Sequence, residues 1–117
     1  MGDFRKLAVW KRAHGVALAV YRVTGRFPGT QRFTLTSRLQ RAAVSICSNI
    51  AEGCGRQGDA ELRRFLRIAR GSANELECQL LLAKDLGCLE TDEWQTLNRD
   101  VRSLSRLLFR LSDALSP

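Results

Sequence analysis

Hydrophobic residues recur at intervals of three and four along most of the chain, which is the spacing of one face of an α-helix. The alternation of apolar and polar residues that marks a half-buried β-strand is not sustained. Proline occurs only at positions 28 and 117, and the first helix is expected from about residue 3 or 4 to Gly25. We expect an all-α fold, a single domain over residues 1–117 that forms an antiparallel four-helix bundle.

Capping and turn residues predict the bounds of the other three helices. The expected N-caps are Thr34 or Thr36 for the second helix, Asp59 for the third and Thr91 for the fourth. The expected ends are Gly53 or Gly55, about Leu86, and about Ala114. Gly87 is expected to terminate the third helix in the left-handed region.

The third and fourth helices each have one apolar stripe, as bundle helices do. The stripe of the third helix consists of Leu62, Phe65, Ala69, Leu76, Leu80 and Ala83. The stripe of the fourth consists of Trp94, Leu97, Val101, Leu104, Leu108, Leu111 and Leu115. Both helices carry arginines on the opposite side, which predicts that this side faces solvent.

The first and second helices are apolar on two sides. The second contains ten consecutive uncharged residues, Ala42 to Ala51, and its main stripe is Leu35, Leu39, Ala42, Ile46 and Ile50. We expect the additional faces to consist of Val16 and Val20 on the first helix, and Val44, Cys47 and Ala51 on the second. Because four helices cannot surround one of their own members, these residues predict an interface with another copy of the chain.

Composition excludes several classes of protein. No apolar run approaches the roughly 20 residues that span a bilayer, and no signal peptide is visible, so a cytoplasmic protein without membrane attachment is expected. The four cysteines, at 47, 54, 78 and 88, form no C-x-x-C pair, and His14 is the single histidine. We therefore expect reduced thiols, no metal, no cofactor, and His14 as a core or interface residue.

The basic charge is concentrated in the first part of the chain. The formal net charge is +7, but residues 1–70 contain 14 Lys and Arg against 4 Asp and Glu, whereas residues 71–117 contain 5 against 8. Such asymmetry favours an anionic partner, RNA or DNA above all. Compositional bias is the alternative explanation, since 16 of the 19 basic residues are arginine.

Arginines form rows along the outer sides of the third and fourth helices. The rows are Arg63, Arg67 and Arg70, and Arg99, Arg102, Arg106 and Arg110, while Arg56, Arg38 and Arg41 extend them. Guanidinium groups in rows can bind successive phosphates, which predicts salt-sensitive binding of nucleic acid with little sequence preference. The alternative is a solvated surface paired with Asp59, Glu61, Asp100 and Asp113.

Four motifs carry a family resemblance: VWK at 9–11, RAAVSI at 41–46, NIAEGCGR at 49–56 and ARGSANE at 69–75. In their order they resemble the 23S rRNA intervening-sequence proteins, a family that includes the accessory variability determinants of diversity-generating retroelements. The resemblance implies a four-helix bundle that assembles as a ring of five and partners such as nucleic acid and a reverse transcriptase. At Cys47 this chain departs from the proline common in the family.

The polar residues of these motifs favour a structural role. Arg41, Ser45, Asn49, Glu52 and Gly53 are expected to form a network that fixes the turn after the second helix. No nucleophile with a base, paired carboxylates or phosphate-binding loop is present, so no catalytic residue is predicted. The sequence predicts a non-enzymatic, nucleic-acid-associated protein, and a protein-interaction scaffold is the alternative.

Overall fold

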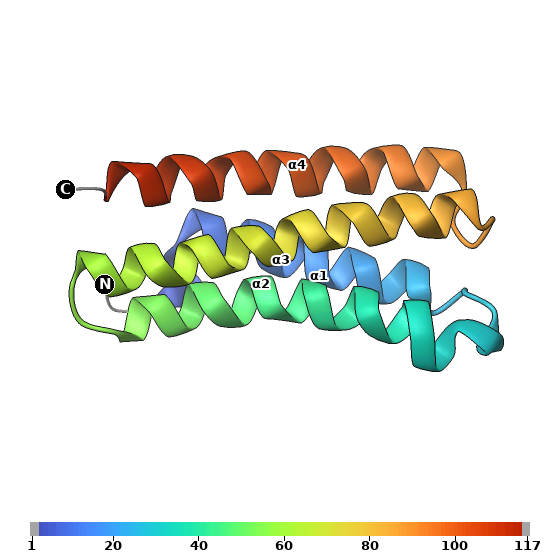
Figure 1. The fold of residues 1–117 in the computed structure, drawn as a ribbon, viewed down its shortest axis with the longest axis horizontal. Helices are drawn as coiled ribbons and strands as arrows, with labels where there is room; N and C mark the ends of the chain where they lie inside the picture. The colour runs from blue at the N-terminus through green and yellow to red at the C-terminus, as the bar shows by residue number, and fades with distance from the viewer. Residues whose placement is uncertain (1–2, 116–117) are drawn as a thin grey trace.

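The computed structural model describes residues 3–115, which form four α-helices and no β-strand. The helices are α1 (Ala8–Thr24), α2 (Ser37–Gly55), α3 (Asp59–Asp85) and α4 (Thr91–Ala114). Successive helices run in opposite directions along a body of 44 × 21 × 20 Å (Figure 1). The all-α bundle predicted from the sequence is confirmed; residues 1, 2, 116 and 117 of the predicted domain lie outside the described residues.

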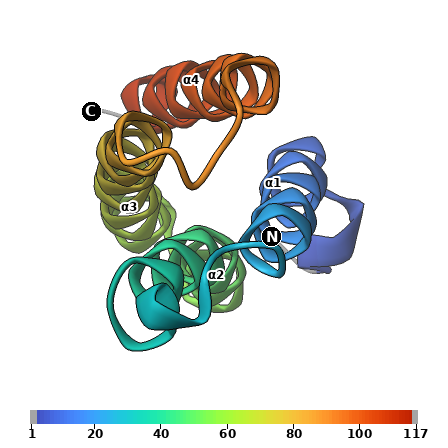
Figure 2. The same cartoon turned by 90° about the vertical axis from the view of Figure 1, so that its right-hand side faces the viewer.

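The four helices, seen end-on in Figure 2, enclose one hydrophobic core. Its largest fully buried side chains are Leu39, Ile46, Ile50, Leu76, Leu80, Leu104, Leu108, Val20 and Val101. All six residues predicted to face inward on α3 are buried. On α4 the prediction is wrong at Leu111, which is 36% exposed, because Ser112 takes the core position one turn after Leu108.

The long uncharged segment of α2 lies between α1 and α3. Ala42, Ala43, Ile46 and Ile50 are buried, whereas Val44 remains 43% exposed. Ser48 is exposed, and Ser45, Cys47, Asn49 and Ala51 are half-buried, because α2 contacts a neighbour on two sides. At most positions of this segment a charged side chain would be at least partly buried, which is unfavourable without a partner.

The outer face of α1 differs from the prediction. Val16 and Val20 are buried in the chain's own core, so assigning them to an intermolecular interface is wrong. The core stripe of α1 contains small residues at intervals of three and four, while Trp10 is half-buried and Tyr21 is 48% exposed. The regularly spaced valines therefore lie on the buried side of α1.

None of the predicted threonine or aspartate side chains caps its helix. Thr36 has helical backbone angles (φ −55°, ψ −51°), because a π-helix, η3 (Arg32–Thr36), leads directly into α2. Asp59 and Thr91 are the first residues of α3 and α4, following Gly58 and Glu90 at the cap positions. Gly87 does adopt the left-handed conformation predicted for it, with φ of 79°.

The connection between α1 and α2 contains two short helical turns, η2 (Gly29–Gln31) and η3. It extends beyond the bundle at the end opposite both termini, beside the start of α2 (Figures 1 and 2). At the other end, η1 (Phe4–Lys6) precedes α1, and Asp3 accepts a hydrogen bond from the Arg5 amide. None of the described helices is long and apolar enough to cross a membrane.

Candidate functional site

Arginines from the start of α3 and the end of α4 meet at one end of the bundle. The two helices are antiparallel neighbours, and the Ser105 hydroxyl donates to Asn74 Oδ1 across their seam at 3.3 Å. In this register, the first turns of α3 lie beside the last turns of α4. Arg67, Arg106 and Arg110 are all exposed there.

The charge is distributed unevenly between the two halves of the bundle. The half that contains the termini, residues 3–16, 46–72 and 103–115, has eleven Lys and Arg against five Asp and Glu. The other half, residues 17–45 and 73–102, has eight against seven. We call the first half the basic end. The predicted rows therefore contribute to one basic end and do not make a surface along the whole bundle.

Arg63 and Arg70 are less exposed than the prediction implied. Both are half-buried. The Arg70 guanidinium lies over the ring of Phe109, 4.6 Å from its centroid, and its Nε is buried without a hydrogen-bond partner among the described residues. Arg70 thus stabilises the α3–α4 seam by a cation–π contact.

Two further arginines of the basic end lie over one aromatic ring. The guanidinium groups of Arg56 and Arg64 lie 5.3 Å and 4.4 Å from the centroid of Phe65. Arg56 pairs with Glu52 at 3.4 Å and Arg64 with Glu61 at 2.9 Å, and the hydrogen bonds from Arg64 lower the pKa of Glu61. The sequence prediction missed Arg64, although its position three residues after Glu61 favours this pair.

Arg99 and Arg102 do not belong to the basic end. Arg99 lies 3.9 Å from Asp100, and Arg102 lies 3.9 Å from Glu77 on α3. Their half of the bundle is nearly neutral. A solvated surface with ion pairs therefore explains these two residues better than a phosphate-binding role.

The polar motif residues join α2 to α3. Asn49 Nδ2 donates to the Ser45 carbonyl oxygen at 2.8 Å and to its hydroxyl at 3.1 Å, and that hydroxyl lies 2.8 Å from the Ser72 hydroxyl. Glu52 pairs with Arg56. Gly53 is buried within α2, so the network does not fix a turn at this residue. The motif residues thus do not form one network: Ser45 contacts α3 through Ser72, whereas Glu52 pairs with Arg56 at the C-terminal end of α2.

The predicted second face of α2 lies beside α1. Val44 and Tyr21 line a shallow cleft of about 370 Å³ together with Arg41, which is exposed. Cys47 and Ala51 are half-buried further along the same helix. His14 is exposed on α1 and is not a core residue; its ring is stacked on that of Trp10 at 4.8 Å. We call Tyr21, Val44, Cys47 and Ala51 the α1–α2 face.

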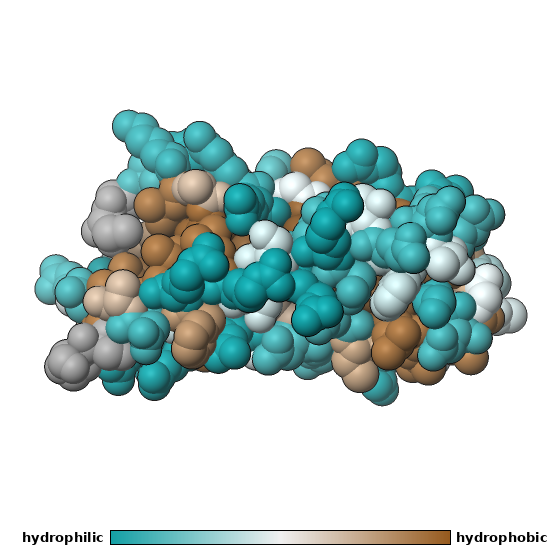
Figure 3. Space-filling view, turned by 90° about the horizontal axis from the view of Figure 1, so that it is seen from above, coloured by the Kyte–Doolittle hydropathy of each residue, from teal (hydrophilic) through white to brown (hydrophobic). Residues whose placement is uncertain are grey.

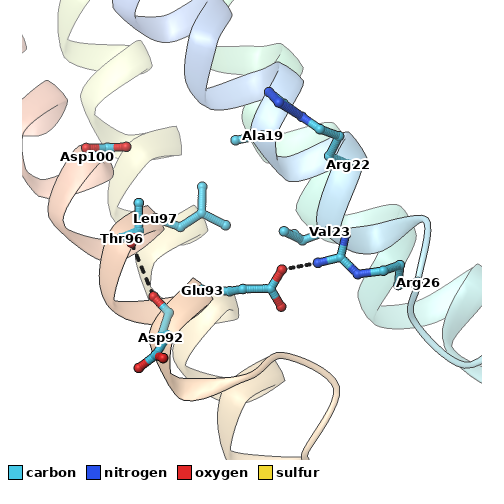
Figure 4. Close-up of a pocket in the computed structure, with 9 residues that line it drawn as sticks. All are labelled: Ala19, Arg22, Val23, Arg26, Asp92, Glu93, Thr96, Leu97 and Asp100. Atoms are coloured by element: carbon cyan, nitrogen blue, oxygen red, sulfur yellow. Dashed lines mark hydrogen bonds and ion pairs between the residues drawn. The ribbon is translucent and has the colours of Figure 1, made fainter.

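A cleft between α1 and α4 is lined by side chains of both charges (Figure 4). Arg22 comes from α1 and Arg26 from the turn that follows it, and Asp92, Glu93 and Asp100 come from α4. Arg26 and Glu93 form an ion pair across the cleft of about 410 Å³. The carboxylates compensate the two arginines, so this cleft does not favour an anion.

An apolar groove of about 320 Å³ lies at the basic end, between the start of α1 and the end of α4. Leu62 and Leu66 form its floor on α3, and the partly exposed Leu111 lines it from α4. Figure 3, which looks onto α4, shows hydrophobic side chains gathered toward this end and a mostly hydrophilic surface elsewhere. No group of His, Cys, Asp and Glu within residues 3–115 is suited to holding a metal ion.

Comparisons with known proteins give the same family as the sequence motifs. The family model described as 23S rRNA-intervening sequence protein matches residues 5–110. No curated protein matches the chain. A solved structure of a protein of unknown function from the S23 ribosomal protein family of Bacteroides thetaiotaomicron aligns with a TM-score of 0.82 and 24% identity, covering 88% of this chain and 96% of that one. The alignment supports the fold, and the family match shows that the chain belongs to the 23S rRNA-intervening sequence proteins.

Proposed function

We propose that this protein is a cytoplasmic accessory protein without catalytic activity that binds nucleic acid through its basic end. The observation that carries the proposal is the excess of eleven basic over five acidic residues in one half of the bundle. Membership of a family associated with rRNA genes agrees with a nucleic-acid partner. The family name by itself identifies no ligand.

The chemistry of the basic end favours phosphate over base recognition. Arg67, Arg106 and Arg110 are exposed on helices, and guanidinium groups can donate two hydrogen bonds to one phosphate. These arginines project from the outer sides of packed helices, so their contacts should be to the phosphate backbone. Such binding weakens as salt rises, because it is driven by release of counterions.

We further propose that the protein acts as a homo-oligomer, a pentamer by its family resemblance. The partly exposed Val44 and Tyr21 on the α1–α2 face support an interface between copies. In a ring, the basic ends would be repeated, and several weak phosphate contacts would act together. The family resemblance also implies a protein partner such as a reverse transcriptase.

The test compares two triple variants that lose the same charge. The first variant carries Gln in place of Arg67, Arg106 and Arg110. The control carries Gln in place of Lys84, Arg99 and Arg102. Binding of labelled RNA and DNA is measured by fluorescence anisotropy over a salt series. The first variant should lose affinity for all sequences, and its salt slope should fall by about 2–3 as three phosphate contacts are lost. The control should resemble wild type.

The second candidate function is a protein-interaction scaffold, which the α1–α2 face favours. A wild-type protein that binds neither RNA nor DNA at low salt would refute the nucleic-acid proposal. Equal losses in the two triple variants would refute the assignment to the basic end. In the first case, the exposed apolar residues of α1 and α2 would become the leading functional surface.

A further inference from the structure

Phe33 is the most exposed large hydrophobic residue of the described chain, with 87% of its surface accessible. It lies on η3, and the Arg32 guanidinium lies 5.5 Å from its ring centroid. Single π-helical turns are rare and are frequently found at functional sites. The ring lies outside the hydrophobic core of the bundle.

The chain around Phe33 is basic and lacks acidic residues. No Asp or Glu occurs between Phe4 and Ala51, while Arg32, Arg38 and Arg41 follow one another through η3 and the start of α2. All three are exposed. The connection lies at the α2 side of the bundle end, whereas the acidic start of α4 lies on the opposite side (Figure 2). An anion can therefore approach this corner without meeting those carboxylates.

A cleft of about 520 Å³ lies next to the ring, and Phe33 and Arg32 form part of its lining. Its volume falls in the range of about 300–1,000 Å³ that is typical of small-molecule sites. The hydroxyl oxygen of Thr36, another lining residue, is buried and has no hydrogen-bond partner among the described residues. Gln40 donates through Nε2 to the Thr24 hydroxyl at 3.1 Å, which leaves its amide oxygen to accept from a ligand. Polar groups thus lie beside an exposed aromatic ring and a cation.

We propose that this corner binds single-stranded nucleic acid, with one base stacked on Phe33 and the adjoining phosphates bound by Arg32 and Arg38. Aromatic rings beside basic side chains are the usual means of holding unpaired strands, because every base has a face that can stack. In a duplex those faces are covered by neighbouring bases, which favours a single strand here. The proposal rests on the proposed function. It adds that the nucleic acid is single-stranded and that it contacts a second region besides the basic end.

The test uses labelled oligo-uridine, oligo-thymidine and a duplex of equal length, with Phe33→Ala, Phe33→Trp and a control. The control is Leu86→Ala, which removes another exposed apolar side chain from the same end of the bundle. Phe33→Ala should weaken single-strand binding about 5- to 150-fold, the expected effect of losing one stacked base. Phe33→Trp should retain binding, and duplex binding and the Leu86 variant should be unchanged.

Three outcomes would overturn the inference. If wild type binds single strands and Phe33→Ala binds them equally well, the corner has no stacking role, and the proposed function of the basic end is unaffected. If light scattering shows that Phe33→Ala dissociates the oligomer, Phe33 is a subunit contact. If wild type binds no nucleic acid, both proposals are refuted.

Discussion

Gly53 allows α2 and α3 to approach each other closely. A Cβ at this position would lie 2.9 Å from the Phe65 Cβ and 3.2 Å from Leu62 Cδ1. Replacing glycine with alanine inside a helix normally stabilises it by about 0.5–1 kcal/mol, but overpacking costs about 1–3 kcal/mol. We expect Gly53→Ala to lower the free energy of unfolding by about 1 kcal/mol or more, measured by urea denaturation.

Gly71 provides the matched control, because it also lies within a helix, and a Cβ there would meet nothing within 4 Å. Gly71→Ala should raise the free energy of unfolding by about 0.5–1 kcal/mol. If both substitutions stabilised the protein, the close approach at Gly53 would not be a constraint on packing.

The thiol of Cys47, on α2, is partly buried. Burial raises its pKa to about 11 from a usual value of 9.0. Because the folded pKa lies above the unfolded one, the thiol's contribution to stability is complete below about pH 9 and is lost as pH rises through about 11. We expect the free energy of unfolding to fall over this window more steeply in wild type than in Cys47→Ala. Parallel pH profiles would contradict this.

At the scale of the elements, the seam between α2 and α3 contains a part-buried hydroxyl pair, Ser45 and Ser72. Ser72→Ala removes the hydrogen bond between the two helices and leaves the Ser45 hydroxyl with only the one from Asn49, so it should cost about 0.5–1.5 kcal/mol in chemical denaturation. Ser105→Ala, which removes an exposed hydrogen bond between α3 and α4, should cost less than about 0.5 kcal/mol. Equal costs would show that burial of the first pair is unimportant.

The helices and their inward faces could largely be predicted from spacing, as the buried stripe of α3 shows. The starts of α2, α3 and α4 were predicted to within one residue, but the side-chain caps were not, because a π-turn precedes α2 and Thr36 is already helical. Val16 and Val20 were assigned to the wrong side of α1 because two apolar faces on one helix give no local signal of which faces the core. Only the neighbouring helices determine that choice.

Part of the candidate site could be predicted from the sequence, but its arrangement could not. Arg67, Arg106 and Arg110 were identified and are exposed. The separation of Arg99 and Arg102 from them depends on the register of α3 and α4, which a single sequence does not specify. Phe33 was missed because an isolated aromatic residue between predicted helices has no periodic pattern around it.

At the scale of the whole molecule, a substitution at Val44 tests the proposed oligomer. It is 43% exposed, so Val44→Glu should leave the folded monomer intact and place an unpaired charge in an interface on the α1–α2 face. Light scattering should show an oligomer for wild type and 13.1 kDa for the variant. Val44→Thr, which keeps the shape without a charge, should remain assembled. A monomeric wild type at micromolar concentration would refute the oligomer.

The unequal charge of the two halves gives the molecule a permanent electric dipole along its 44 Å axis. A polyanion exerts a torque on such a body, so the bundle turns its basic end forward before any side chain makes contact. The range of this torque is set by the ionic atmosphere, about 8 Å at physiological salt and about 30 Å at 0.01 M. A polyanion would therefore orient the bundle from about 30 Å away in dilute buffer, and only from about 8 Å at physiological salt.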